Sequence, residues 1–190
     1  MKLFFKVSSI ALIVSASVLL CFAVETDKQT NNLIGKKLPS FNLKSTTREN
    51  VLLGSFKNKK LIIFMFSTKC PYSASNAKYL QKILKKQTAF QLIAICLDGE
   101  VGDINNSGKT QELAAKNFEK KYFPDNPKVK VLLANDDFRR NYARFLKLDT
   151  MRTAPITLFA DAKSIIVEAF VGSASSEQLE QAAKKLTSEK

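Results

Sequence analysis

The sequence predicts an α/β fold in which a mixed sheet carries helices on both of its faces. Two observations lead to this prediction. Three apolar runs of strand length alternate with amphipathic helical segments, a pattern typical of parallel strands joined by crossover helices. Two further apolar runs near the C-terminus are separated only by the turn 161–163, which is too short for a crossover and predicts an antiparallel pair.

A hairpin is expected at the start of the fold. The apolar pieces Phe41–Leu43 and Val51–Leu53 flank the polar segment Lys44–Asn50, as the strands of a hairpin flank their turn. The run Leu61–Phe66 follows and contains no polar residue. A run of this kind predicts a strand that is buried on both faces.

A helix is predicted after this strand, beginning at or just after Cys70. Its apolar positions recur at helical spacing and are Ala77, Leu80, Ile83 and Leu84. Phe90–Leu97 is a second buried strand, and the Gly- and Asn-rich segment Asp98–Lys109 is expected to be a loop.

The second half of the chain continues the alternation. One helix, stopped by Pro124 and Pro127, is marked by Leu113, Ala114, Phe118 and Tyr122. The short strand Val129–Leu133 follows. The next helix is marked by Phe138, Tyr142, Phe145 and Leu146.

The antiparallel pair consists of Ile156–Ala160 and Ser164–Phe170. After it, Ser175 and Gln178 have the spacing of a capping box and predict the start of a last helix. Its apolar positions are Leu179, Ala182, Ala183 and Leu186.

One domain with an N-terminal appendage is predicted for the 190 residues. The hydrophobic fraction of 45% and the 14 phenylalanines indicate a globular protein. We expect a signal peptide or membrane anchor at residues 1–23, a polar linker at 24–32 and the folded domain at 33–190.

The N-terminus has the layout of a secretory signal, because two lysines precede the uncharged stretch Val7–Val24. Three fates remain open, in order of preference. They are cleavage after Ala23, retention as an anchor, and lipidation of Cys21, which is disfavoured because Leu20 stands where a small residue is usual. Each fate places the domain in the bacterial periplasm or on the outer face of the cytoplasmic membrane. A buried helix of the fold is the remaining alternative.

The net charge of +13 comes from scattered lysines, which lack the aromatic interleaving of a nucleic-acid surface. We therefore expect no nucleic-acid partner. The basic surface would be solvated or would lie against anionic lipid headgroups. The chain contains no histidine, so Cys–His pairs and His-ligated metal sites are excluded. We expect neither a metal nor a cofactor.

Cys70 is the candidate nucleophile. Pro71 fits the first position of a helix, where its missing N–H costs nothing. Cys70 would then lie at the helix N-terminus, where unpaired backbone N–H groups and the helix dipole favour a thiolate. Lys69 adds a positive charge next to it. The alternative is a buried, inert cysteine, which is the more usual role of a lone cysteine, but these three features together favour a reactive thiol.

Residues 34–73 resemble the opening of the TlpA/ResA-like thioredoxin family, within the wider redoxin group. That opening has a Gly-x-x-x-Pro-x-Phe entry, an apolar strand and a Thr-x-Cys-Pro-x-Cys site. The matching residues are Gly35, Pro39, Phe41, Thr68, Cys70 and Pro71. Asn58–Lys59 replaces the family's Gly-Lys turn, and Lys69 replaces the aromatic residue before the cysteine.

The segment Thr153–Asp161 is similar to the cis-proline segment of thioredoxins. With both motifs, the resemblance spans about Leu33 to the C-terminus and implies a thioredoxin-like three-layer fold. It also implies that Pro155 takes a cis bond beside Cys70, and that Thr153 and Ala154 form a ledge for a substrate's backbone.

The remaining candidate substrate-binding residues surround the thiol. Thr68 and Lys69 would shape the approach to Cys70, with Pro71 and Tyr72 on its other side. These roles follow from the resemblance and from the position of the residues next to the cysteine.

Ser73 is the main departure from the family, because it stands where the second cysteine would be. In thioredoxin-like dithiols the second cysteine resolves the mixed disulfide, which a serine cannot do. Ser73 would instead orient or stabilise the thiolate of Cys70, and turnover would need an external thiol. Monothiol glutaredoxins also carry a C-x-x-S site, so the pattern does not imply inactivity.

Cys96 lies within a strand that we expect to be buried, so a small apolar core residue is the favoured interpretation. A disulfide with Cys70 is the alternative, and it would need the two Cα atoms within about 7 Å.

The predicted function is thiol–disulfide exchange on envelope proteins through Cys70. The first alternative is a thioredoxin-fold module that binds polypeptides without catalysis. A weaker alternative is a one-Cys thiol peroxidase, which is similar around the cysteine. However, Ile63 and Ser67 occupy the places of that family's proline and threonine, and Pro155 stands where its late arginine would be. A copper-delivering redoxin would need a histidine ligand, which the chain lacks.

Overall fold

The structure is a computed structural model, and it describes residues 30–87, 89–99, 107–148 and 154–188. The predicted signal or anchor and most of the linker lie outside these ranges, as does Thr153. Among the described helices, none has the length and apolarity needed to cross a membrane.

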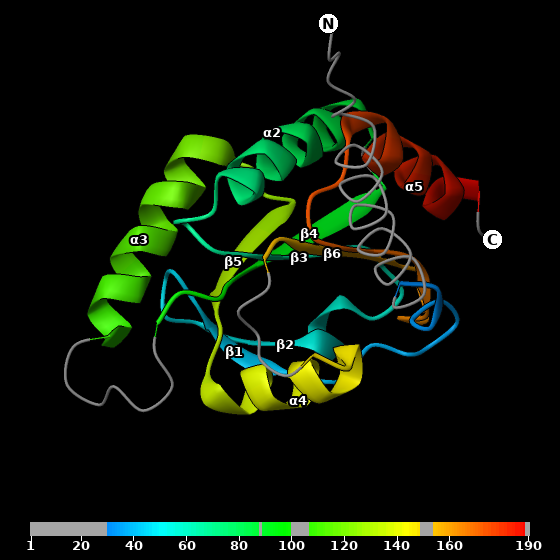
Figure 1. The fold of residues 1–190 in the computed structure, drawn as a ribbon. Helices are drawn as coiled ribbons and strands as arrows, with labels where there is room; N and C mark the ends of the chain where they lie inside the picture. Colours follow the sequence, from blue (N-terminus) through cyan, green and yellow to red (C-terminus); the bar gives the residue numbers. More distant parts are fainter. Residues whose placement is uncertain (1–29, 88, 100–106, 149–153, 189–190) are drawn as a thin grey trace, which may run out of the picture.

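A mixed sheet forms the centre of the fold (Figure 1). Within the described residues its strands lie in the order β2-β1-β5-β4-β3-β6-β7. They are β1 (Asn42–Ser45), β2 (Asn50–Leu52), β3 (Lys60–Phe66), β4 (Phe90–Cys96), β5 (Val129–Leu133), β6 (Ile156–Ala160) and β7 (Ile166–Val171). Strands β3, β4 and β5 are parallel, whereas β6, β7 and the β1–β2 hairpin pair antiparallel. The predicted mixed sheet is confirmed.

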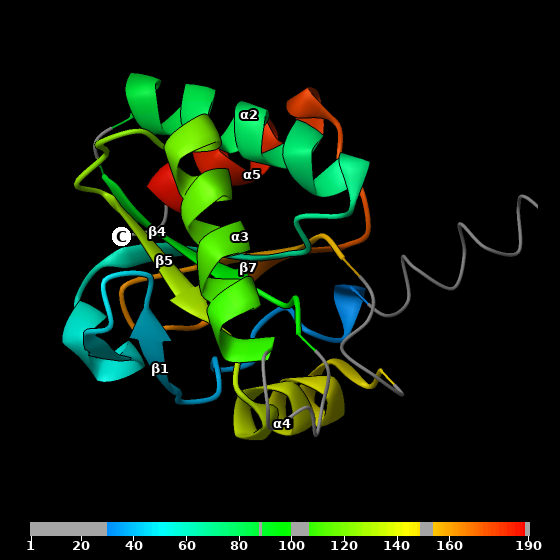
Figure 2. The ribbon, with the colours of Figure 1, turned by 90° about the vertical axis from the view of Figure 1, so that its left-hand side faces the viewer.

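Helices cover both faces of this sheet. They are α2 (Pro71–Lys86), α3 (Ser107–Tyr122), α4 (Asp136–Leu146) and α5 (Ser176–Ser188), with the 3₁₀-helix η1 (Leu53–Phe56). Helices α2 and α5 lie together on one face with α3 beside them, and α4 lies on the opposite face (Figures 1 and 2). The three-layer α/β architecture that the sequence predicts is therefore present.

Strand β3 shows why its sequence is continuously apolar. Ile62, Phe64 and Phe66 pack into the core beneath α2 and α5. The alternate residues, Leu61, Ile63 and Met65, pack into the second core against α4 and the N-terminal segment. All six side chains are fully buried, because the sheet is covered on both sides. This strand carries the chain to the start of α2, where Cys70 lies.

The N-terminal segment of the domain is tied to β7 and α4. The N–H of Gly35 donates to the carbonyl of Ile166 at 2.8 Å, and Gly35 has a φ of +81°, which favours glycine. The hydroxyl of Tyr142 in α4 donates to the carbonyl of Pro39 at 2.9 Å. The Gly-x-x-x-Pro entry is thus a strap that closes the α4 side of the core.

Two predictions about helix starts can be compared with the structure. The capping box is confirmed, because the N–H of Ser175 donates to Gln178 Oε1 and the N–H of Gln178 donates to Ser175 Oγ. The predicted end of the loop Asp98–Lys109 is wrong, since α3 already begins at Ser107. Polar residues that favour a loop in the sequence belong there to the first turn of a helix.

Candidate functional site

Cys70 is the residue from which α2 begins. It is the N-cap, with extended backbone angles (φ −92°, ψ 118°), and Pro71 occupies the first helical position. Its carbonyl accepts hydrogen bonds from the N–H groups of Ser73 at 3.1 Å and Ala74 at 3.4 Å, which close the first turn. The thiol is free and half-buried. The structure therefore places Cys70 at a helix N-terminus, as the sequence predicts.

The sulfur of Cys70 lies 3.4 Å from the carbonyl oxygen of Ala154, to which the thiol donates. The peptide bond between Ala154 and Pro155 is cis, as the resemblance implied. These segments are 84 residues apart in the chain. They meet because β3 and β6 are neighbours, with Met65 opposite Ile156 at the end that leads to the thiol. Pro155 itself is buried.

Ser73 is fully buried one turn into α2. Its hydroxyl oxygen accepts a hydrogen bond from the N–H of Ser67 at 3.2 Å. No hydrogen bond joins the side chains of Ser73 and Cys70, both of which are described, and the Cys70 thiol donates to Ala154 instead. The buried Ser73 hydroxyl instead holds Ser67, in the loop that precedes the cysteine, in place.

The predicted substrate-binding residues divide into two groups. Lys69 and Pro71 are exposed on either side of the thiol, and the side chain of Tyr72 is 59% exposed. A tyrosine with this exposure offers apolar area and a hydroxyl to a partner. Thr68 differs from them, because it is half-buried and its N–H and hydroxyl are already used within the protein.

Thr68 is bound to a residue that sequence reasoning missed. Its N–H donates to both carboxylate oxygens of Asp98, at 3.2 and 3.0 Å, and its hydroxyl also donates to Asp98 Oδ2. Asp98 follows the buried strand β4, which is parallel to β3. The carboxyl ends of parallel strands meet at one edge of a sheet, and this was the sequence signal that could have identified Asp98.

Arg139 of α4 lies behind Asp98. Its guanidinium donates to the carbonyls of Leu97, Asp98 (2.9 Å) and Ala134 (3.2 Å). Burial lowers the pKa of the Arg139 guanidinium, and the nearby carboxylates of Asp136 and Asp98 oppose this effect. No sequence pattern indicated Arg139, because its partners are backbone atoms brought together by the fold.

Cys96 is fully buried in β4, among the side chains beneath α2. Burial raises the pKa of its thiol to about 12, and the carboxylate of Asp98 adds to the increase. Cys96 and Cys70 are both free, so they form no disulfide. The interpretation of Cys96 as a core residue is confirmed.

Two buried polar groups lie on the elements that form the site. Among the described side chains, the buried polar atoms without a hydrogen-bond partner are those of the Asn76 amide and the Thr157 hydroxyl. Asn76 lies one turn beyond Ser73 on α2, and Thr157 lies two residues beyond Pro155 on β6. Neither residue has a role that the sequence predicts.

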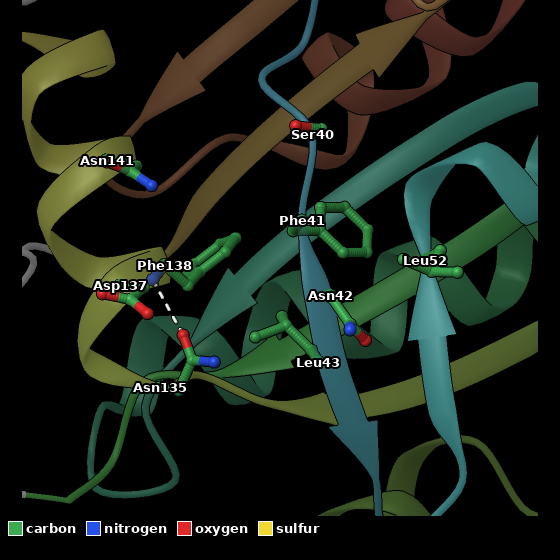
Figure 3. Close-up of a pocket in the computed structure, with 9 residues that line it drawn as sticks. All are labelled: Ser40, Phe41, Asn42, Leu43, Leu52, Asn135, Asp137, Phe138 and Asn141. Atoms are coloured by element: carbon green, nitrogen blue, oxygen red, sulfur yellow. Dashed lines mark hydrogen bonds between the residues drawn. The ribbon is translucent and has the colours of Figure 1, made fainter.

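A hollow of about 290 Å³ lies elsewhere, between α4 and the β1–β2 hairpin (Figure 3). Phe41, Leu43 and Phe138 provide its apolar wall, and Asn135 at its rim caps α4 by accepting from the N–H of Phe138 at 2.8 Å. None of the predicted site residues lines it. Within the described ranges, no group of three or more Cys, Asp or Glu side chains is arranged to hold a metal ion.

Comparison with known proteins agrees with this geometry. Residues 33–186 match the Redoxin family. None of the curated proteins matches the sequence.

Solved structures share the fold at low identity. A thiol:disulfide interchange protein of the thioredoxin family from Chlorobium tepidum TLS is 19% identical, with a TM-score of 0.61 over 79% of this chain and 94% of that chain. A secreted Mycobacterium tuberculosis disulfide oxidoreductase homologous to E. coli DsbE is 16% identical, with a TM-score of 0.57 over 76% and 94%. The exposed lipoprotein thioredoxin Etrx1 of Streptococcus pneumoniae is 16% identical, with a TM-score of 0.57 over 78% and 100%. These similarities establish the thioredoxin-like fold.

Proposed function

The chain belongs to the Redoxin family, and from this we propose that it is an exported monothiol thioredoxin-like protein. It carries out thiol–disulfide exchange on envelope proteins, with Cys70 as the nucleophile. The observation that carries this proposal is the position of the Cys70 sulfur, at the start of α2 and 3.4 Å from the carbonyl of Ala154. Two of the similar structures are a thiol:disulfide interchange protein and a disulfide oxidoreductase, which supports the same chemistry.

The proposed reaction begins with the thiolate of Cys70. It attacks one sulfur of a substrate disulfide, forms a mixed disulfide and releases the other substrate sulfur as a thiolate. Ser73 has no thiol with which to resolve this intermediate. An external thiol therefore attacks the Cys70 sulfur, which releases the reduced substrate. A second external thiol then attacks the disulfide formed at Cys70 and restores the free cysteine.

The surroundings of the thiol support a polypeptide substrate. The cis peptide at Ala154–Pro155 lies beside the sulfur, and we assign Thr153 and Ala154 the role of pairing with the substrate's backbone. Lys69 and Tyr72 project outward and would contact side chains that flank the substrate cysteine.

Export is supported by the charge and hydropathy pattern of residues 1–24. Two of the similar proteins are described as secreted or exposed. The domain would then lie in the periplasm or at the outer face of the cytoplasmic membrane, where its basic surface would lie near anionic lipid. Cleavage after Ala23 would give a mature chain that begins at Val24. The intact mass of the protein from an envelope fraction would show whether this cleavage occurs.

Mixed-disulfide trapping tests the chemistry. The full chain is incubated with an oxidised envelope extract, quenched with acid and examined on a non-reducing gel. All proteins carry Cys21→Ser, so that the N-terminal segment contributes no thiol. In this background we expect adducts with Cys70 present and with Cys96→Ala, and none with Cys70→Ser. Adducts that persist in Cys70→Ser would refute the assignment of the nucleophile.

A non-catalytic binding module is the second candidate, and the serine at position 73 favours it. Such a module would retain partners in the Cys70→Ser variant, through non-covalent contacts with the same surface. The one-Cys peroxidase is not favoured, because the place of that family's proline is taken by Ile63, which is fully buried in β3.

A further inference from the structure

We propose that Asp98 is a positioning residue for Cys70, and that it acts by fastening Thr68 to the end of β4. The inference rests on the proposed exchange reaction at Cys70. It also changes the role of Thr68, which the sequence analysis placed among the substrate-binding residues. In the structure the N–H and the hydroxyl of Thr68 both donate to Asp98 and are not available to a substrate.

The contact between Thr68 and Asp98 has the features of a strong link. One carboxylate receives both the N–H and the hydroxyl of a single residue, and both carboxylate oxygens take part. Hydrogen bonds to an ionised acceptor are about twice as strong as those between neutral groups. The ladder between β3 and β4 leads directly to it, because the N–H of Leu97 donates to the carbonyl of Phe66 at 2.7 Å.

Asp98 is held from behind by α4. Arg139 donates to the carbonyls of Leu97 and Asp98, and so fixes the backbone at the point where β4 ends. The same guanidinium reaches the carbonyl of Ala134, which follows β5. A continuous path of hydrogen bonds therefore runs from α4, through the end of β4, to the loop that carries the nucleophile.

Apart from the bond from the Cys70 thiol to the carbonyl of Ala154, the other hydrogen bonds of this loop are local. The N–H of Cys70 donates to the carbonyl of Ser67 at 3.2 Å, and the N–H of Lys69 donates to Ser67 Oγ at 3.3 Å. Ser67 itself is bound to Ser73 in the first turn of α2. These contacts give the loop its shape, but they do not connect it to the rest of the sheet. The hydrogen bonds from Thr68 to Asp98 connect the loop to the end of β4, two residues before Cys70.

Fixing the loop matters for the proposed chemistry. Exchange requires that the Cys70 sulfur approaches the target sulfur while the substrate backbone is held at Ala154. Both groups must keep their relative position, and a displacement of about 1 Å can cost roughly a hundredfold in rate. A small alkylating reagent has no such requirement, because it needs only an accessible thiolate.

The test compares two reagents on the full-length protein. One is a blocked, extended peptide that carries a single cysteine as its 2-pyridyl disulfide, and the other is iodoacetamide. In the first reaction Cys70 attacks the peptide's cysteine sulfur and releases 2-thiopyridone. Modification of Cys70 is followed by mass spectrometry of the tryptic peptide Cys70–Lys78, which separates it from the other cysteines.

We expect Thr68→Val to slow exchange with the peptide about tenfold and to change the iodoacetamide rate less than about twofold. Asp98→Ala also removes the bonds from the backbone N–H of residue 68, so it should slow exchange at least as much as Thr68→Val. The double variant should be no slower than Asp98→Ala alone, because the hydroxyl acts only through this carboxylate. Thr68→Ser keeps the hydroxyl and should recover most of the exchange rate.

Thr46→Val is the matched control. The hydroxyl of Thr46 also donates to a carboxylate, Glu119 Oε2 at 2.7 Å, but at the far side of the sheet next to β1. This variant should lose a similar amount of stability while both rates stay as in the wild type. Equal slowing by Thr46→Val, or an unchanged exchange rate in both Thr68→Val and Asp98→Ala, would overturn the inference. If Cys70 in the wild-type protein reacts with neither reagent, the proposed function is overturned instead.

Discussion

The hydroxyl oxygen of Ser73 accepts a hydrogen bond from the backbone N–H of Ser67 at 3.2 Å, and it makes none with the thiol of Cys70. The residue at the resolving position is therefore part of the scaffold of the loop. Its Cα nevertheless lies within one helical turn of Cys70, since the N–H of Ser73 donates to the Cys70 carbonyl.

Ser73→Cys should therefore create a working dithiol. Residues at the N-cap and third position of a helix are close enough for a disulfide, so the new thiol can attack a mixed disulfide at Cys70. We expect the lifetime of the mixed disulfide with a peptide to fall at least about tenfold, since the attack becomes intramolecular. The lifetime is measured by acid quenching and mass spectrometry.

Ser75→Cys is the control for this prediction. It adds a thiol on the exposed side of the same helix, where the Ser75 hydroxyl donates to the carbonyl of Pro71. The mixed disulfide should keep its lifetime in this variant. An equal shortening in both variants would mean that any added thiol resolves the intermediate, and that the position of residue 73 is not special.

Cys96 should make stability depend on pH in the alkaline range. Burial raises the pKa of its thiol from 9.0 to about 12 in the folded protein. The unfolded chain therefore begins to release this proton near pH 9, while the folded protein retains it. The contribution to stability is complete below pH 9 and declines as the pH rises towards 12, by at most about 1.4 kcal/mol per pH unit.

Urea unfolding at pH 8 and pH 10.5 measures this effect. Cys96→Ala should be less stable than the wild type at pH 8, because it loses a buried sulfur, and the difference should shrink at pH 10.5. A constant difference across the range would show that Cys96 titrates alike in both states.

Thr157→Val should stabilise the protein. The Thr157 hydroxyl is fully buried and has no partner among the described residues, whereas valine has the same shape without a polar atom. Removing an unsatisfied buried hydroxyl is expected to raise the free energy of unfolding by about 1–2 kcal/mol. Chemical denaturation checks this value. Destabilisation by a similar amount would reveal a hydrogen bond made by the hydroxyl.

Tyr142→Phe should destabilise the α4 side of the core. The side chain is fully buried and stacks on Phe138, with ring centroids 4.2 Å apart, and its hydroxyl donates to the carbonyl of Pro39. Phenylalanine keeps the stacking but leaves that carbonyl unpaired. The free energy of unfolding should fall by about 1–2 kcal/mol. The rate of exchange at Cys70 should not change. This outcome would distinguish the stabilising role of Tyr142 from the positioning role of Asp98.

Much of the fold could be predicted from the sequence, because local residue preferences and the pattern of apolar residues point to the same elements. The run Leu61–Phe66 is apolar at every position, and both of its faces are indeed covered. Ser175 and Gln178 sit at the spacing of a capping box and form one. The start of α3 escaped prediction, because Ser107 and Gly108 favour a loop as readily as a first turn.

The sequence by itself predicted that Cys70 lies at a helix N-terminus, because this depends on its neighbours along the chain, and the resemblance to thioredoxins implied the cis bond before Pro155. Tertiary structure alone decided what surrounds them. Asp98 reaches Thr68 across 30 residues, and Arg139 reaches the carbonyl of Leu97 across 42. Such contacts follow from the order of the strands and from which backbone groups each strand end leaves unpaired, and no periodicity encodes them.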